Sequence, residues 1–204
     1  MGDHGKAVKL LLADKRVDPS IDGNWAICWA SGNGRVEVVR LLIKANGVDP
    51  SARDNCAIQL ASARGHVEVV KILAEANGVD PSADDNFAIQ QASENGHVEV
   101  VRLLLQDKRV NPSARGNFAI YVASNNGHVE VVRLLLADKR VDPSAGDNAA
   151  IIWASARGHV EVVSVLLKDK RVDPSALDNY AIRFASENGH AEVVKLLQLA
   201  ISNK

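Results

Sequence analysis

Residues 114–144 read ARGNFAIYVASNNGHVEVVRLLLADKRVDPS, and closely similar stretches recur along the chain with a fixed period of 31 residues. Two landmarks keep that period in six units, an asparagine and a proline. They are Asn24, Asn55, Asn86, Asn117, Asn148 and Asn179, with Pro19, Pro50, Pro81, Pro112, Pro143 and Pro174. Self-similarity at about 20 to 50 residues is typical of a solenoid, in which each unit buries its apolar face only against its neighbours. We therefore look for function on a repeated surface.

Each unit contains the signals for two short helices. After Asn117, a first helix of about ten residues is predicted to stop at Gly127, because glycine readily takes the left-handed conformation that ends helices. A second helix is predicted over 129–137, where apolar residues form a continuous stripe and polar residues face away. Pro143 then forbids further helix and favours extended backbone. The unit is thus helix, tight turn, helix and short extended loop.

The period divides the chain of 204 residues into seven segments. The first is a half-repeat cap, because its leucines at 10–12 lie one period before the apolar residues at 41–43. The predicted boundaries are 1–20 for the N-terminal cap, 21–51, 52–82, 83–113, 114–144 and 145–175 for repeats 1 to 5, and 176–204 for repeat 6 with the C-terminal cap.

Composition narrows the classes of partner. The chain has 24 Lys and Arg against 25 Asp and Glu, so no global positive field attracts nucleic acid or anionic membranes. No signal peptide begins at Met1, and no apolar run approaches the roughly 20 residues of a membrane helix. We expect a soluble, cytoplasmic chain that is a monomer when free, with no nucleic-acid partner and no membrane partner.

Residues that could carry chemistry have structural explanations. His66, His97, His128, His159 and His190 recur at one turn, and a catalytic histidine is rarely needed five times. Their regular place at the start of the second helix favours a structural role. Cys28 and Cys56 belong to adjacent units, whose helices are typically about 8 to 10 Å apart, so a disulfide is not expected. No phosphate loop, nucleophile elbow or metal-binding spacing is present. We expect no enzyme, no catalytic residue, no metal and no cofactor.

The pattern Ala-Ser-x-x-Gly-His-Val-Glu-Val-Val-x-Leu-Leu-Leu at 123–136 resembles the ankyrin repeat from the end of its first helix through its second. The resemblance implies an all-α, ankyrin-like solenoid of stacked helix-turn-helix repeats. It also implies a non-enzymatic platform that binds other proteins along a concave surface of first helices and loop fingers. Two features depart from the family: residues 118–121 read FAIY where ankyrin repeats have Thr-Pro-Leu-His, and the period is 31 instead of about 33. The units must therefore be linked differently.

Comparing the six units separates the first helix into two classes of position. The positions of Asn24, Ala26, Ile27, Ala30 and Ser31 keep the same residue in all six units, and these positions share one helix face. The positions numbered 25, 28, 29, 32 and 33 in repeat 1 vary and cover the opposite face. All the aromatic residues lie in the variable class: Trp25, Trp29, Phe87, Phe118, Tyr121, Trp153, Tyr180 and Phe184. Stiff aromatic side chains on a varying face are typical of interface hot spots.

The variable positions give the predicted partner contacts. The position 28 series, with its mixture of amide, aromatic and charged residues, is expected to face solvent most. For the position 25 series, we favour packing between adjacent repeats slightly over contact with a partner. For the position 29 series, we favour the two roles equally. The predicted contact residues are Trp25, Cys28, Trp29, Gln59, Phe87, Gln90, Gln91, Phe118, Tyr121, Val122, Ile152, Trp153, Tyr180, Arg183 and Phe184, with Arg53, Asp84 and Arg115 in the loops.

The sequence thus predicts a protein-binding scaffold with an aromatic-rich surface. Two alternatives stay open: a small-molecule or glycan site in which Trp25 and Trp29 stack on a flat ligand, and a purely structural array whose aromatic residues are all buried between repeats. A uniform framework with variation on one face fits recent natural duplication and equally an engineered consensus scaffold. The sequence does not identify the partner.

Overall fold

The computed structural model describes residues 3–202, and within that range the chain forms thirteen α-helices and no β-strand. The all-α repeat solenoid expected from the sequence is confirmed. The first helices of the six repeats are α2 (Ile21–Gly32), α4 (Ala52–Ala63), α6 (Ala83–Glu94), α8 (Ala114–Asn125), α10 (Ala145–Ala156) and α12 (Ala176–Glu187). The second helices are α1 (Asp3–Ala13), α3 (Val36–Ile43), α5 (Val67–Ala74), α7 (Val98–Gln106), α9 (Val129–Ala137), α11 (Val160–Leu166) and α13 (Ala191–Ser202).

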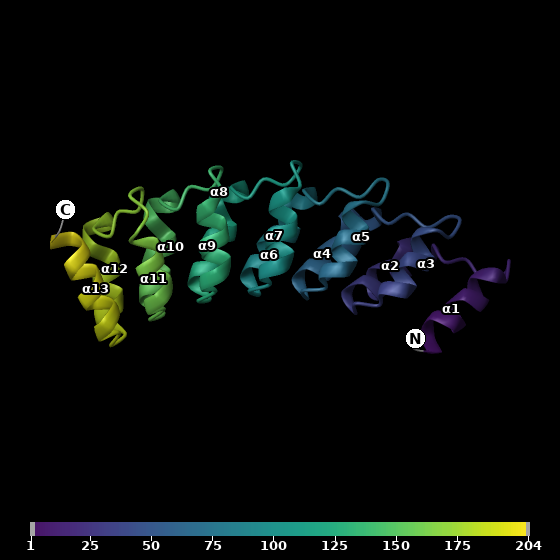
Figure 1. The fold of residues 1–204 in the computed structure, drawn as a ribbon, viewed down its shortest axis with the longest axis horizontal. Helices are drawn as coiled ribbons and strands as arrows, with labels where there is room; N and C mark the ends of the chain where they lie inside the picture. The colour runs from purple at the N-terminus through teal and green to yellow at the C-terminus, as the bar shows by residue number, and fades with distance from the viewer. Residues whose placement is uncertain (1–2, 203–204) are drawn as a thin grey trace.

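The helices stand side by side in a gently arched row, with the loops that join successive repeats along one edge (Figure 1). Each first helix packs against the first helix of the next repeat, and each second helix against the next second helix. Helix α1 is a second helix without a first, and it packs against α3. Since helices of 7 to 12 residues are marginal alone in water, stacking has to supply their stability.

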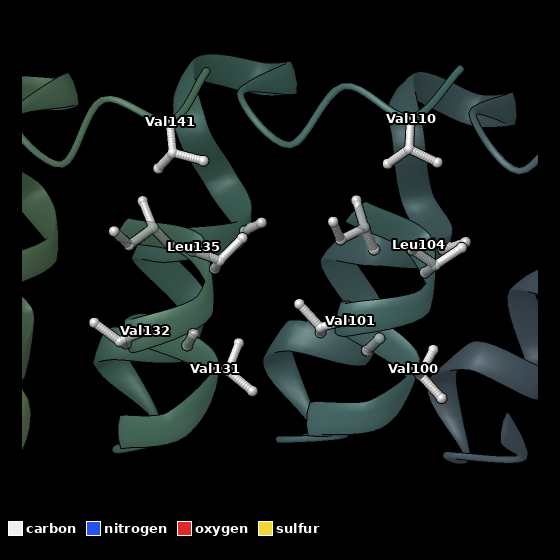
Figure 2. Packing of buried hydrophobic residues seen from close by; sticks show 14 of the residues in the cluster. Val100, Val101, Leu104, Val110, Val131, Val132, Leu135 and Val141 are labelled. Atoms are coloured by element: carbon white, nitrogen blue, oxygen red, sulfur yellow. The ribbon is translucent and has the colours of Figure 1, made fainter. Parts of the chain in front are cut away.

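The core repeats the same aliphatic side chains in every layer. In α7 and α9, the buried residues Val100, Val101 and Leu104 occupy the same register as Val131, Val132 and Leu135 (Figure 2). The isoleucines of the first helices complete the layer, because Ile27, Ile58, Ile89, Ile120 and Ile151 are each at most 1% exposed. Burying each such side chain contributes about 1.5–3 kcal/mol. The unchanging face of the first helix is therefore the core face, as its constancy predicted.

Each first helix is preceded by a short left-handed turn. In α8, Arg115, Gly116 and Asn117 have φ values of 52°, 67° and 64°, so the right-handed helix begins at Phe118. Left-handed backbone costs most L-residues about 1–2 kcal/mol, and Gly, Asn and Asp tolerate it best. The second and third residues of this turn are only Gly, Asp or Asn in all six repeats. No side chain caps the helix at this turn, because Ser113 makes no capping bond and the Asn117 side chain bonds to a loop.

The asparagine that ends this turn links the start of its repeat to the loop at the end of the same repeat. Asn117 is 9% exposed, and its Oδ1 accepts a hydrogen bond of 2.7 Å from the backbone N–H of Asp142. The same bond joins Asn24 to Asp49, Asn55 to Asp80, Asn86 to Asn111 and Asn148 to Asp173, at 2.6–2.8 Å. A bond from a buried side chain to the loop that ends its repeat explains why this position never varies.

The recurring histidines form a second link, and this one joins successive repeats. The Nε2–H of His159 donates to the carbonyl oxygen of Asn125, 34 residues earlier, at 2.9 Å. His66, His97, His128 and His190 make the equivalent bond to the preceding repeat at 2.9–3.1 Å. A Cβ atom at Gly127 would lie 2.8 Å from the His159 ring, so the glycine before each histidine also makes room for the next ring. The structural role predicted for these histidines is confirmed, and they replace the missing Thr-Pro-Leu-His links.

An arginine adds a third link where the loop reads Asp-Lys-Arg. Arg140 pairs with Asp138 and donates to the carbonyl oxygens of Val110 at 2.7 Å and Leu105 at 3.3 Å in the preceding repeat. Arg109 makes both equivalent bonds, to Val79 and Ala74, and Arg171 makes the first of them, to Val141. Repeats 1 and 2 end in Ala-Asn-Gly instead and lack the arginine. The charge-assisted bonds lower the pKa of Asp107, Asp138 and Asp169 below the ordinary value.

The asparagine link predicts a graded loss of stability. Asn117→Gly keeps the left-handed turn but removes the bond to Asp142, so the free energy of unfolding should fall by about 1 kcal/mol. Asn117→Ala also places a strained residue in the turn, and the loss should reach about 2 kcal/mol or more. Urea denaturation followed by circular dichroism measures both. If the free energy of unfolding falls equally in the two variants, the left-handed conformation of residue 117 adds no strain to the alanine variant.

The Asp-Arg pairs predict a pH dependence. A carboxyl whose pKa is lowered on folding stabilises the protein above its unfolded pKa of about 3.9, and this contribution is lost as the pH falls through the folded pKa. In the variant with Asp107, Asp138 and Asp169 all changed to Asn, the free energy of unfolding should fall less steeply below about pH 4. Urea denaturation at several pH values tests this. If the free energy of unfolding falls with pH as steeply as in the parent chain, other carboxyls cause the loss of stability in acid.

Candidate functional site

The variable face of the first helices carries the aromatic residues, and none of them is buried. Trp29 is 53% exposed, Trp25 46% and Trp153 37%, while the five Phe and Tyr residues are half-buried. We call the side chains at positions 25 and 29 of the six repeats the first-helix face. It holds every aromatic residue except Tyr121, which adjoins it at position 28. Exposed aromatic surface distinguishes this face, because the exposed large apolar side chains elsewhere, such as Leu10, Ile21 and Leu199, are aliphatic.

The position 28 series contradicts its prediction as the most exposed one. Cys28, Gln90 and Ile152 are buried, at 0%, 2% and 4% exposure, and only Arg183 is exposed. Gln59 and Tyr121 of the same series are half-buried. In repeat 1 the reason is direct, because the Cys28 thiol is hydrogen-bonded to Cys56 at position 25 of the next repeat. Position 28 therefore packs toward the neighbouring repeat.

The two cysteines are free thiols in contact with each other. Burial, followed by the contact with Cys56, raises the pKa of the Cys28 thiol to about 12. A thiol that stays protonated is a poor nucleophile, so the Cys28 thiol is unreactive at neutral pH. The expected helix spacing did not foresee the contact, because the side chains lean together across the gap. As a partner contact, Cys28 was predicted wrongly.

The position 29 series is the more accessible of the two series in the first-helix face. Trp29 and Trp153 are exposed and Leu60, Gln91 and Phe184 are half-buried, whereas Val122 is buried at 6% and was predicted wrongly as a contact. The series at position 25 is mostly half-buried, and only Trp25 is exposed there. The guanidinium of Arg53 lies 5.2 Å from the centre of the Trp25 ring, so part of that ring is already used within the array.

Two aromatic clusters stand on this side of the C-terminal half. In α8, Phe118 and Tyr121 have ring centres 5.6 Å apart. In α10 and α12, Phe184 contacts Trp153 edge to face at 6.1 Å and Tyr180 at 4.1 Å. Such pairs hold each other's rings in place, because tilted and edge-to-face contacts are favourable geometries. The rings thus form a semi-rigid surface.

Two hollows flank Trp153. One, of about 260 Å³, lies between repeats 4 and 5 and is lined by Phe118, Tyr121, Ala149 and Trp153. The other, of about 220 Å³, lies between repeats 5 and 6 beside Phe184. Larger hollows of about 470 and 520 Å³ lie between α1 and α3, away from the aromatic residues. We place the candidate site at Trp153, because only there do hollows and exposed aromatic side chains coincide.

The three loop residues predicted as contacts lie at the edge of this face. Arg53, Asp84 and Arg115 are exposed, and each is the first residue of a left-handed turn. Ala149 is a site residue that the sequence analysis missed. Its small side chain could have indicated a hollow, because the same position holds Trp, Cys, Phe, Phe and Tyr in the other repeats.

Sequence comparison agrees with this geometry. Family models of ankyrin repeats match residues 1–85, 76–147 and 151–198, which is most of the chain. The chain belongs to the ankyrin-repeat family. A crystal structure of an ankyrin-repeat domain from Acinetobacter baumannii superposes with a TM-score of 0.65 and 23% identity, covering 85% of this chain and 96% of that one. Comparison with curated proteins finds no match. The structural similarity supports the fold and says nothing about the partner.

The ankyrin array shows no arrangement suited to metal chemistry over residues 3–202. No group of three or more His, Cys, Asp or Glu side chains in that range could hold a metal ion. Over the same residues, no helix has the length and apolarity to cross a membrane. The histidines and cysteines are instead engaged between repeats, as described above.

The different exposure of two neighbours in α2 of the ankyrin array predicts different costs of truncation. Trp29 is 53% exposed and Ile27 1%. Trp29→Ala should lower the free energy of unfolding by less than about 1 kcal/mol, whereas Ile27→Ala should cost about 2–5 kcal/mol. Denaturant melts of the two variants test this. A comparable loss for Trp29→Ala would assign that ring to the core.

Proposed function

We propose that this ankyrin array is a non-enzymatic scaffold that binds a protein partner through the first-helix face. The observation that carries the proposal is Trp153, an exposed tryptophan with a hollow on each side. Tryptophan surrounded by packed, partly desolvated neighbours is the commonest kind of hot spot at protein interfaces. Its position between the two aromatic clusters gives a partner one place to gain most of its binding energy.

Rigidity supports the same function. The turn before each first helix is fixed by the asparagine link, and the turn after it by the histidine link, for example at Asn117 and His159. The backbone that carries the aromatic side chains is therefore ordered before any partner arrives. A pre-ordered surface loses little conformational entropy on binding, so a few contacts give useful affinity.

The size of the hollows favours a protein over a small-molecule or glycan ligand. Sites for such ligands typically enclose about 300–1,000 Å³ and bury most of the ligand. The hollows beside Trp153 measure about 260 and 220 Å³ and are open. They suit single side chains of a larger molecule. The purely structural alternative requires buried aromatic residues, and none of the aromatic side chains is buried.

Capture from a lysate of the organism that encodes the chain tests the proposal. Three immobilised proteins are compared: the parent chain, the double variant Trp29→Ala/Trp153→Ala, and Arg102→Ala/Arg133→Ala as a matched control on the exposed side of the second helices. We expect at least one protein to be retained by the parent and the control but lost about tenfold or more with the double variant.

The three proteins should have similar melting temperatures. Differences in the captured proteins then reflect the changed surfaces and not a loss of fold. Retention of the same proteins by all three baits would contradict a role for the first-helix face. Retention lost only in the arginine variant would move the binding site to the second helices.

A further inference from the structure

Exposed apolar side chains are concentrated at the N-terminal end of the array. Of the ten large apolar side chains that are exposed among the described residues, six lie between residues 10 and 29. They are Leu10, Leu11, Val17, Ile21, Trp25 and Trp29. Terminal layers of repeat proteins usually present a polar outer face to water. The end of this array where α1 and α2 stand does not (Figure 1).

Three core positions of the repeat are exposed at this end. Leu11 is 54% exposed, whereas the leucines at the equivalent position of the six repeats are at most 4% exposed. Val17 and Ala26 are also exposed, although their equivalents are buried in repeats 2 to 5. Over residues 3–202, α1 is the one second helix with no first helix before it. These side chains therefore lack the helix that covers them in the other layers.

Two tryptophans border the same surface. Positions 25 and 29 pack toward the preceding repeat, because Cys56 at position 25 contacts Cys28, and Leu60 at position 29 lies 3.2 Å from where a Cβ of Gly32 would be. In repeat 1 both positions hold tryptophan, with no preceding first helix beside them. With the three core positions they form what we call the N-terminal face: Leu11, Val17, Trp25, Ala26 and Trp29.

The internal layers show what covers such a face. Every repeat supplies a first helix with the pattern Asn-x-Ala-Ile-x-x-Ala-Ser, and in repeats 2 to 5 its alanine and isoleucine side chains are buried in the stack. A charged or strongly polar helix side would bury polar groups without partners against these apolar residues. The N-terminal face therefore fits an amphipathic helix whose packing side carries alanines and a large aliphatic residue.

Arg35 gives that helix a direction. It occupies the place of the recurring histidine, and each histidine donates to the carbonyl oxygen of the last residue in the preceding first helix, as His66 does to Gly32. The Arg35 side chain is exposed and lines a hollow of about 470 Å³ between α1 and α3. A helix that ends there offers its free C-terminal carbonyl groups to the guanidinium.

We infer from these observations that the N-terminal face binds an amphipathic helix of a partner protein in the place of a missing first helix. This site goes beyond the proposed function, because it lies at the end of the array and includes α1. A folded second copy of the chain is a poor source of the helix. Each of its first helices packs beside its own second helix, which would collide with α1.

A peptide copy of one of the chain's own helices tests the inference. The probe is acetyl-ADDNFAIQQASENGH-amide, the sequence of residues 83–97, titrated into the isotope-labelled full chain and followed by amide chemical shifts. We expect saturable shifts at residues 8–18 and 25–35. The matching peptide with asparagine in place of isoleucine has the same charge and should bind about tenfold more weakly, because it loses the buried aliphatic side chain.

Leu11→Asp is the matched variant of the chain. It places a carboxylate on the N-terminal face at an exposed site, so the fold should be kept and the peptide should bind about tenfold more weakly or less. Leu199→Asp makes the same change at an exposed leucine of α13 and should leave binding unaltered. Trp25→Ala leaves α1 unchanged and replaces Leu11→Asp if the latter has a lowered melting temperature.

Each contrary result overturns the inference. No saturable shifts, shifts confined to residues after 35, equal affinity of the isoleucine and asparagine peptides, or full binding by Leu11→Asp would each do so. Sedimentation equilibrium adds a further test: a dimer of the parent chain that Leu11→Asp dissociates would show that a second copy covers the face. Lysate capture through Trp153 does not involve Leu11, so the two proposals fail separately.

Discussion

The hydrogen bonds between successive repeats are the constraint on which the rest of this array depends. Helices of 7 to 12 residues have little stability of their own, and each repeat exposes an apolar face unless a neighbour covers it. Apolar packing alone does not fix how one layer lies on the next. The bond that His159 makes to the preceding repeat, and its equivalents, set that register at the end of the first helix. The bond of Asn117 fixes the loop that leads to the next repeat. Arg109, Arg140 and Arg171 add a third link on the side of the second helices.

The same bonds explain how the first-helix face can vary without loss of the fold. The residues that join the layers and those that fill the core occupy fixed positions. The exposed positions of the first helix therefore contribute little to the stability of the fold. Large apolar side chains can then remain in water, as Trp29 and Trp153 do. The cost is exposed apolar surface, which is tolerated on soluble proteins mainly where another molecule covers it. The proposed binding surface is therefore compatible with a scaffold whose stability comes from the core and from the bonds between repeats.

Variation between repeats also creates shape. A column of large residues that contains one alanine produces a hollow between repeats 4 and 5. This hollow is not visible in a single repeat, because it depends on the difference between a residue and its equivalent one period away. Specificity in a repeat protein can arise from such differences, since the repeated framework is common to all layers.

Four features could be predicted from the amino-acid sequence alone: the period, the two helices of each unit, the core positions, and the place of all aromatic residues at the variable positions. These follow from local rules: helical periodicity, proline and glycine as helix breakers, and constancy where a residue is buried. Only the tertiary structure decided which variable positions face water. Cys28, Gln90, Val122 and Ile152 are covered by side chains of their surroundings in the stack, and the angle around an isolated helix cannot show this. The bonds that the histidines make and the hollow at Ala149 likewise require two layers in contact, because each relates residues of different repeats, such as His159 and Asn125. The asparagine bond requires the folded loop, because it joins residues 25 positions apart at the two ends of one repeat.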